Sequence, residues 1–212
     1  MFNLKKVAIV ILLASVAAFA QQVGPAPGGS PDPLGLSALV INAFPMGNPP
    51  SGITFTLTGQ PSITALPAGM FQGLGGLVTL DLGTNALTSL PSGIFSTNTA
   101  LTTLSLYNNA LTSLPSGIFS TNTALTYLDL NTNALTSLPS GTFSVLTVLT
   151  TLNVSINALD VASVDNVLAD LVTAGASGGT VNTSGGANAP PDSAGLISEA
   201  ALIASGWTVT TN

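Results

Sequence analysis

One pattern of leucines repeats along the middle of the chain at an interval of 24 residues. Its copies begin at Leu77, Leu101, Leu125 and Leu149, and each reads Leu-x-x-Leu-x-Leu/Val-x-x-Asn-Ala-Leu. Within a copy, leucines two residues apart lie on one face of a short strand and the residues between them face the other way. A unit this small cannot bury its apolar face alone. The period therefore predicts a stack of coils that share one core.

Other columns keep the same phase as the leucines. The inward strand positions are expected to be Leu80 and Leu82, Leu104 and Leu106, Leu128 and Leu130, and Leu152 and Val154. Asparagines end each strand, and an inward asparagine at a bend can pair buried backbone groups. We therefore expect a structural ladder of Asn85, Asn109, Asn133 and Asn157, beside an apolar column of Phe71, Phe95, Phe119 and Phe143. Asn98 and Asn122 stand where Leu74 and Leu146 mark an apolar position, and we expect looser packing there.

These residues follow the pattern LxxLxLxxNxLxxLPxGxF, and in this the chain resembles the 24-residue class of the leucine-rich repeat family, found in bacterial surface and secreted proteins. The resemblance covers Leu77 to Asp160 and extends to a degenerate earlier unit, with Ile63 and Phe71 in phase but Pro61 in place of the asparagine. It implies an α/β solenoid. That fold is a right-handed arc with a parallel concave β-sheet, a β-rich N-terminal cap and a helix-containing C-terminal cap.

The ends of the chain differ from the repeats in composition. Residues 1–20 combine Lys5 and Lys6 with an apolar run that ends in Ala18-Phe19-Ala20. This is typical of a secretory signal peptide, with an uncleaved anchor as the alternative. Residues 21–33 form a Pro/Gly-rich leader. We expect an N-terminal cap and degenerate first repeat over 34–76, with apolar runs 36–44 and 53–58 paired as a hairpin, then four repeats over 77–160.

The segment 161–212 is expected to form C-terminal capping units. Residues 160–175 place Val164, Val167, Leu168 and Leu171 on one helical face, with Ser163 as a candidate N-cap and Gly175 as the stop signal. A strand near 180–183, a second helix near 198–205 and a last strand over 207–210 complete the prediction.

Charge narrows the possible partners. Lys5 and Lys6 are the only basic side chains, so the chain without residues 1–20 carries eight acidic side chains and no Lys, Arg or His. A surface without cationic side chains disfavours binding to nucleic acid and to anionic lipid. The chain has no cysteine, which excludes a lipoprotein anchor. We expect a secreted or cell-surface protein that is not inserted in a membrane after signal cleavage.

The same composition excludes most catalytic residue types. Nucleophilic triads with histidine and Cys/His metal sites cannot form beyond residue 20. Asp81 and Asp129 should lie about 10 Å apart, near the upper limit for an inverting glycosidase, but both are expected to be exposed, with no apolar pocket. A calcium site from Asp81, Asp129, Asn131 and Asn153 is chemically plausible, although its ligands are spread over several rows. We therefore predict no enzyme activity, no cofactor and no metal.

Comparison of the repeats points to a binding surface. Residues 85–102 recur unchanged as 109–126, so the rows differ mainly at outward strand positions, which also hold the only tyrosines, Tyr107 and Tyr127. The family uses this concave surface for binding, and free drift of exposed positions is the alternative. The expected ligand-binding residues are Thr79, Asp81, Thr103, Ser105, Tyr107, Asn108, Tyr127, Asp129, Asn131, Thr151, Asn153 and Ser155.

Three hypotheses for the function follow. The first is a secreted, non-enzymatic binding module for a protein or glycan. The second is a structural extracellular scaffold or surface-layer component. The third is ice binding by recurring Thr and Ser columns such as Thr88, Thr112 and Thr136.

Overall fold

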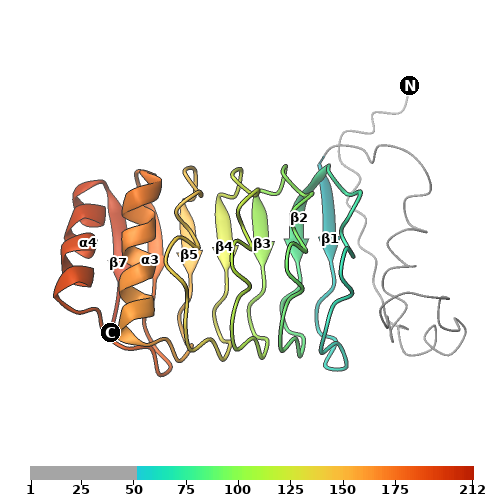
Figure 1. Cartoon of the computed structure of the whole chain (residues 1–212), viewed down its shortest axis with the longest axis horizontal. Helices are drawn as coiled ribbons and strands as arrows, with labels where there is room; N and C mark the ends of the chain where they lie inside the picture. The colour runs from blue at the N-terminus through green and yellow to red at the C-terminus, as the bar shows by residue number, and fades with distance from the viewer. Residues whose placement is uncertain (1–51) are drawn as a thin grey trace, which may run out of the picture.

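The computed structural model describes residues 52–212. The expected signal peptide, the leader and the apolar run 36–44 lie outside the described residues. The described chain forms one parallel sheet of seven strands in sequential order, and Figure 1 shows the strands side by side along the stack. The strands are β1 (Ile53–Thr56), β2 (Leu77–Asp81), β3 (Thr103–Ser105), β4 (Tyr127–Asp129), β5 (Thr151–Asn153), β6 (Gly179–Asn182) and β7 (Trp207–Thr210).

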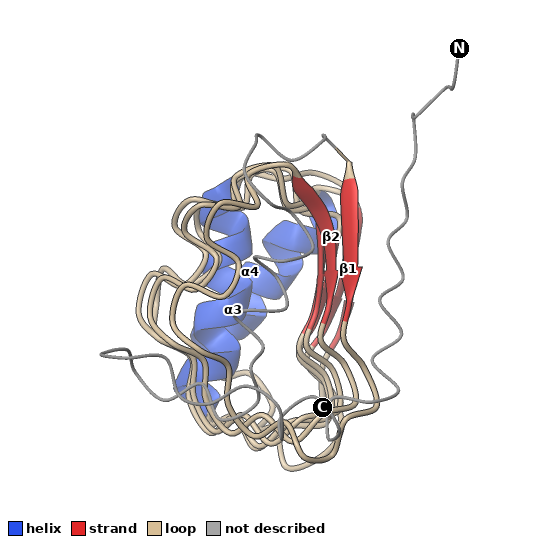
Figure 2. Cartoon of the chain, turned by 90° about the vertical axis from the view of Figure 1, so that its right-hand side faces the viewer, coloured by secondary structure: helices blue, strands red, loops and turns tan. Residues whose placement is uncertain are grey.

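Two helices follow the fourth full repeat, α3 (Val161–Ala174) and α4 (Ser193–Ala204). Seen along the stack in Figure 2, the sheet lies on one side, and the return segments and both helices lie on the other. The fold is the open α/β solenoid that the resemblance of the sequence implies. Within residues 52–212, no helix is both long and apolar enough to span a membrane.

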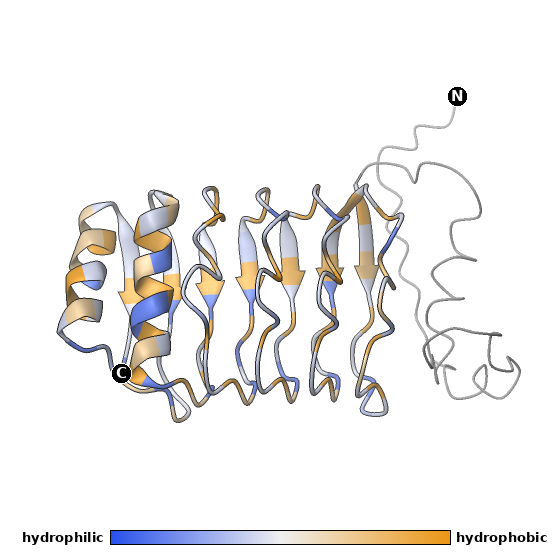
Figure 3. Cartoon of the chain, in the orientation of Figure 1, coloured by the Kyte–Doolittle hydropathy of each residue, from blue (hydrophilic) through white to orange (hydrophobic). Residues whose placement is uncertain are grey.

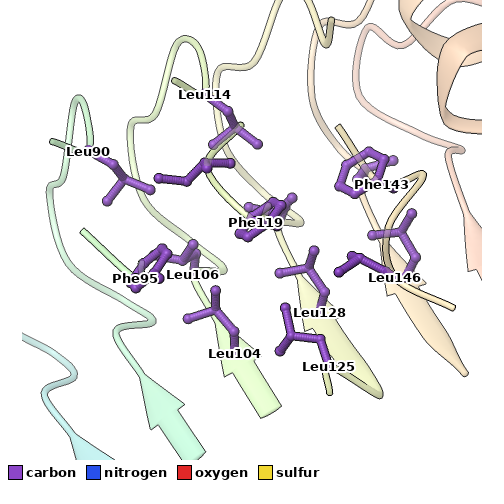
Figure 4. Packing of buried hydrophobic residues seen from close by; sticks show 14 of the residues in the cluster. Leu90, Phe95, Leu104, Leu106, Leu114, Phe119, Leu125, Leu128, Phe143 and Leu146 are labelled. Atoms are coloured by element: carbon purple, nitrogen blue, oxygen red, sulfur yellow. The ribbon is translucent and has the colours of Figure 1, made fainter. Parts of the chain in front are cut away.

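The core consists of the predicted columns. One leucine of each strand from β2 to β5 is buried and lies beside the equivalent leucine of the next strand. These are Leu80, Leu104, Leu128 and Leu152. Figure 3 shows the apolar positions of successive strands at the same level, and Figure 4 shows the leucines packed against the phenylalanines. Phe71, Phe95, Phe119 and Phe143 are stacked, with ring centroids 6.1, 6.4 and 6.2 Å apart along the column.

The strand-end asparagines bind the backbone of two rows at once. The side-chain amide of Asn109 donates to the carbonyls of Leu82 (3.0 Å) and Leu106 (3.1 Å), and its oxygen accepts from the Leu87 amide (3.0 Å). Asn133 and Asn157 repeat this arrangement one and two rows later. Asn188 continues the ladder, accepting from the Leu159 amide and donating to the Val154 carbonyl. It was not predicted because the longer connection through α3 breaks the 24-residue spacing before it.

The expectation of looser packing at Asn98 and Asn122 is wrong. Both side chains are fully buried and form a second asparagine column beside the phenylalanines. Asn98 donates to the carbonyls of Phe71 (3.0 Å) and Leu74 (2.9 Å), and Asn122 donates to those of Phe95 (3.0 Å) and Asn98 (3.0 Å). The return loops leave carbonyl groups that a leucine could not pair, so a polar residue fits this interior position.

The N-terminal end of the sheet is formed by β1. β1 joins the sheet as a strand parallel to β2, with a register shift between Ile53 and Thr54. The hairpin partner expected for it falls in 36–44, outside the described residues. The first unit has Pro61 at the position of the ladder asparagine. Its Leu57 carbonyl is paired by the side-chain amide of Asn85 in the next row (2.7 Å).

At the other end, both helices begin at aspartates. α3 is capped by Asp160, which accepts from the Ser163 amide (2.8 Å), so the predicted cap at Ser163 is wrong. Ser163 is instead buried and accepts from the Leu138 amide (2.9 Å). α4 begins at Ser193 rather than near 198, because Asp192 accepts from the amides of the first turn. The end of α3 at Gly175 and the strand over 207–210 are confirmed.

Candidate functional site on the concave face

The parallel register places the predicted ligand-binding residues in columns on the outer face of the sheet. Thr79, Thr103, Tyr127 and Thr151 form one column, and Asp81, Ser105, Asp129 and Asn153 form the next. Thr180 and Asn182 of β6 extend the two columns by one row. They were not predicted because the longer connection through α3 hides their phase in the sequence. Since strands lie about 4.8 Å apart, neighbours in a column are close enough for one ligand to touch several rows.

Tyr107 lies over a glycine of the preceding row. A Cβ atom added at Gly83 would be 2.1 Å from Cε1 of Tyr107, so only glycine leaves room for the phenol ring in this position. The ring is half-buried as a result. Gly83 was not predicted as a site residue, although its position as the single glycine opposite a tyrosine is visible in the sequence. Gly83 thus leaves the space that the ring of Tyr107 occupies on the sheet.

Tyr127 and Asp129 form a hydrogen-bonded pair on β4. The Tyr127 hydroxyl donates to Oδ2 of Asp129 (3.2 Å), and Oδ1 of Asp129 accepts from the backbone and side-chain amides of Asn131. Tyr127 is 37% exposed, whereas Asp129 is only 7% exposed. The expectation that Asp129 is a solvated surface acid is therefore wrong. The phenol and the amide around its carboxylate remove it from water while satisfying its oxygens.

The pKa of Tyr127 depends on three neighbouring side chains, those of Asp129, Asp81 and Tyr107. Partial burial raises the pKa of Tyr127, and so do the charge of Asp129 and its hydrogen bond. The charge of Asp81 and the neighbouring phenol of Tyr107 raise this pKa further. The two tyrosines and two aspartates thus form one cluster on the concave face, which we call the Tyr–Asp cluster. Its field is negative and opposes any additional negative charge.

The ionisation of Tyr127 gives a direct test of this environment. In a Tyr107→Phe background, the remaining phenol should ionise above pH 10, and Asp129→Asn should lower its midpoint. The folded protein holds this proton more tightly than the unfolded chain does. The resulting stability is fully present below pH 10 and is lost as the pH rises through the folded-state pKa. Ultraviolet absorbance of phenolate measures the midpoint, and equal midpoints with and without the Asp129 carboxylate would contradict the cluster.

Several of the predicted residues also end the strands. Oδ1 of Asp81 accepts from the Gly83 amide (2.9 Å), and Oδ1 of Asn153 accepts from the Ser155 amide (3.2 Å) and hydroxyl (2.7 Å). Asn182 makes the same turn with Ser184. Aspartate and asparagine are favoured at such turns because the short side chain bonds the backbone two residues on. This structural demand accounts for part of the limited variation in the column.

Two of the predicted residues have structural roles that need no ligand. Ser155 is 7% exposed and its hydroxyl is bonded to Asn153. Asn108 is exposed but belongs to the turn after β3, where its φ is 51°. Thr84, Thr132 and Ile156 occupy the same left-handed conformation in the other rows. Asparagine tolerates this conformation better than β-branched residues do, so a backbone demand explains Asn108 without a ligand.

The described residues hold no cluster of three or more His, Cys, Asp or Glu side chains that would suit a metal ion. The residues considered above for a calcium site, Asp81, Asp129, Asn131 and Asn153, make hydrogen bonds within the turns that end their strands. The arrangement offers hydrogen-bond donors and acceptors, two phenol rings and negative charge to a ligand that lies across the strands.

Comparisons with known proteins agree with this architecture. A family model described as "Leucine rich repeat" matches residues 54–111 and 99–159. The crystal structure of the LRIM1/APL1C complex is similar with a TM-score of 0.52 and 26% identity, over 65% of this chain and 24% of that one. The leucine-rich repeat domain of APL1B is similar with a TM-score of 0.53 and 27% identity, over 77% of this chain and 44% of that one. The chain thus spans less than half of either protein, and no curated protein matches its sequence.

Proposed function

Because the chain belongs to the leucine-rich repeat family, we propose that it is a secreted, non-enzymatic binding module that holds a protein ligand on its concave face. The family typically binds proteins, and the similar LRIM1/APL1C structure is itself a complex. The basic and apolar pattern of residues 1–20 supports export, which brings the concave face outside the cell.

The observation that carries the proposal is the Tyr–Asp cluster. Tyrosine supplies a large, rigid ring with a polar tip, and such residues dominate the energetics of protein interfaces. Both tyrosines of the chain lie on this face, in adjacent rows. The hydroxyl of Tyr127 is already held by Asp129, so this side chain would lose little freedom on binding. The ring of Tyr107 lies in the space that Gly83 leaves.

The charge of the face favours a ligand with basic side chains. Residues 52–212 contain no Lys, Arg or His, so no side-chain cation of the described chain neutralises Asp81 and Asp129. A lysine or arginine of a partner would meet two carboxylates and two aromatic rings in the Tyr–Asp cluster. Association with such a partner should slow as salt screens the long-range attraction. A neutral glycan, the alternative ligand, would show little salt dependence.

A double substitution tests the proposal. Proteins that bind the immobilised chain should bind the Tyr107→Ala, Tyr127→Ala variant at least about tenfold more weakly, since two interface anchors are lost. The measurement is the dissociation constant by surface plasmon resonance for one purified partner at two salt concentrations.

The matched control is Val148→Ala, which removes a side chain that is 48% exposed in the return segment before β5. The control should keep wild-type affinity, and both variants should unfold close to the wild-type midpoint. Wild-type affinity in the double variant, or an equal loss in the control, would contradict a binding site at the Tyr–Asp cluster.

A further inference from the structure

Two asparagines on the concave face share a sequence that the other asparagines lack. Asn153 ends β5 and Asn182 ends β6, and the strand register places them side by side. Each of these strands is paired on both sides, so the two positions lie within the sheet and away from its edges. Both begin an Asn-x-Ser sequence, Asn153-Val-Ser155 and Asn182-Thr-Ser184, and no other asparagine of the chain begins Asn-x-Ser or Asn-x-Thr.

In both residues the amide oxygen is bonded and the amide nitrogen is not. Oδ1 of Asn153 accepts from the backbone amide (3.2 Å) and the hydroxyl (2.7 Å) of Ser155. Oδ1 of Asn182 accepts from the same groups of Ser184, at 3.0 and 2.8 Å. Within residues 52–212, Nδ2 of each asparagine donates to no protein group and is not enclosed by the protein. Both nitrogens therefore reach solvent.

Most other asparagines of the described chain use this nitrogen in a structural hydrogen bond. The asparagines of the ladder and of the second column donate it to backbone carbonyls. Asn131, Asn166 and Asn212 donate it as well. Between residues 52 and 212, only Asn108 and the two Asn-x-Ser asparagines keep Nδ2 free of a hydrogen bond. The Asn-x-Ser sequences thus fall on asparagines whose nitrogen the fold does not use.

The turn at the end of the strand does not require a serine. It needs a side-chain oxygen and the backbone amide two residues on. Asp81 with Gly83, and Asp129 with Asn131, form this turn without a hydroxyl. The serine hydroxyl in the rows of β5 and β6 is therefore an addition to the turn. A hydroxyl two residues after an asparagine is the feature that marks an acceptor for an N-linked glycan.

We propose that Asn153 and Asn182 carry N-linked glycans, which are added during export of the chain. The inference rests on the export that is part of the proposed function. In the transfer, Nδ2 forms a bond to the anomeric carbon of an oligosaccharide carried on a lipid pyrophosphate. The bond between that carbon and the pyrophosphate oxygen breaks, and the lipid pyrophosphate leaves with the electron pair. One proton of Nδ2 passes to a base of the transferase.

The folded chain can accommodate this product. A glycan on Nδ2 leaves Oδ1 unchanged, so the hydrogen bonds from Ser155 and Ser184 remain. At the ladder, by contrast, a glycan would displace the bonds from Nδ2 to buried carbonyls. Asn153 lies beside Asp129 in the strand register, so its glycan would border the Tyr–Asp cluster. A protein partner would then contact β4 and the rows before it.

Secretion of the full chain from cultured animal cells tests the proposal. Mass spectrometry of peptides cut at aspartates should find a glycan on both asparagines, and a peptide N-glycosidase should remove it and leave aspartate. Ser155→Ala should lose only the glycan of Asn153, and Ser184→Ala only that of Asn182, because each removes one hydroxyl. Ser184→Thr is the matched control. It keeps a hydroxyl and should keep both glycans.

Secreted protein in which both asparagines are unmodified would overturn the proposal. Glycans that persist after Ser155→Ala or Ser184→Ala at the neighbouring asparagine would also overturn it. A second chain, with a signal sequence of the host in place of residues 1–20, separates this proposal from export. If only that chain reaches the medium, the export signal of residues 1–20 is refuted, while the state of Asn153 and Asn182 in the secreted chain still decides the glycan sites.

Discussion

Replacing Phe119 by alanine should lower the free energy of unfolding by about 4 kcal/mol. The ring is fully buried and stacks between Phe95 and Phe143, at centroid distances of 6.4 and 6.2 Å. The substitution removes the apolar contacts of the ring, leaves a cavity in the middle of the stack and breaks two aromatic contacts. Urea unfolding followed by circular dichroism measures the loss.

The repeat provides its own matched comparison. Phe95 lies in residues 85–102, whose sequence is identical to that of residues 109–126 around Phe119. The ring centroid of Phe95 is 6.1 Å from that of Phe71 and 6.4 Å from that of Phe119. Phe95→Ala should therefore cost about as much as Phe119→Ala, and Phe119→Leu should cost clearly less because it leaves a smaller cavity. A loss below about 1 kcal/mol for Phe119→Ala would show that the phenylalanine column does not hold the rows together.

The second large effect is expected at Asn157. Its side-chain amide donates to the carbonyls of Leu130 (3.1 Å) and Val154 (3.0 Å), and its oxygen accepts from the Leu135 amide (3.1 Å). The side chain is almost fully buried, so Asn157→Ala leaves these backbone groups without partners and should cost about 3 kcal/mol. Thermal or urea unfolding measures this cost.

Asn157→Asp separates the hydrogen bonds from the volume of the side chain. Aspartate has nearly the same shape, but at neutral pH it directs a charge at carbonyl oxygens that need a donor. This variant should be at least as unstable as Asn157→Ala, whereas Thr136→Ala on the exposed return loop should change stability by less than about 0.5 kcal/mol. An Asn157→Asp protein as stable as the wild type would contradict a structural role for the ladder.

The sequence predicted the features that depend on the period. A strict 24-residue interval places Leu80, Leu104 and Leu128 at equivalent sites, so the strands, their parallel register and the apolar columns follow from it. The helical face of Val164 and Leu168 was also visible, because both residues keep the spacing of a buried stripe. These are properties of the repeating pattern, and they need no knowledge of individual contacts.

The features that were missed depend on individual neighbours. Hydropathy predicts looser packing at Asn98 and Asn122, because it does not reveal the carbonyl groups of the adjacent row that need a donor. Asp160 and Ser163 are both capping residue types, and only the start of α3 decides between them. The burial of Asp129 depends on the rotamers of Tyr127 and Asn131. The role of Gly83 likewise requires knowing where the ring of Tyr107 lies.

The sequence predicted capping units at the two ends of the solenoid but not all of their details. α4 has few polar residues on any face, so a periodic pattern does not reveal where the helix begins. The N-cap Asp192 sets its start.

Nuclear magnetic resonance can locate a partner that lies across the concave face at the Tyr–Asp cluster. Amide and side-chain resonances of the labelled chain would be followed while a purified binding partner is added. The perturbed residues should cluster in β3, β4 and the turns after them, around Tyr107 and Tyr127. Perturbations confined to the return loops or to α4, with the resonances of Tyr107 and Tyr127 unchanged, would contradict it.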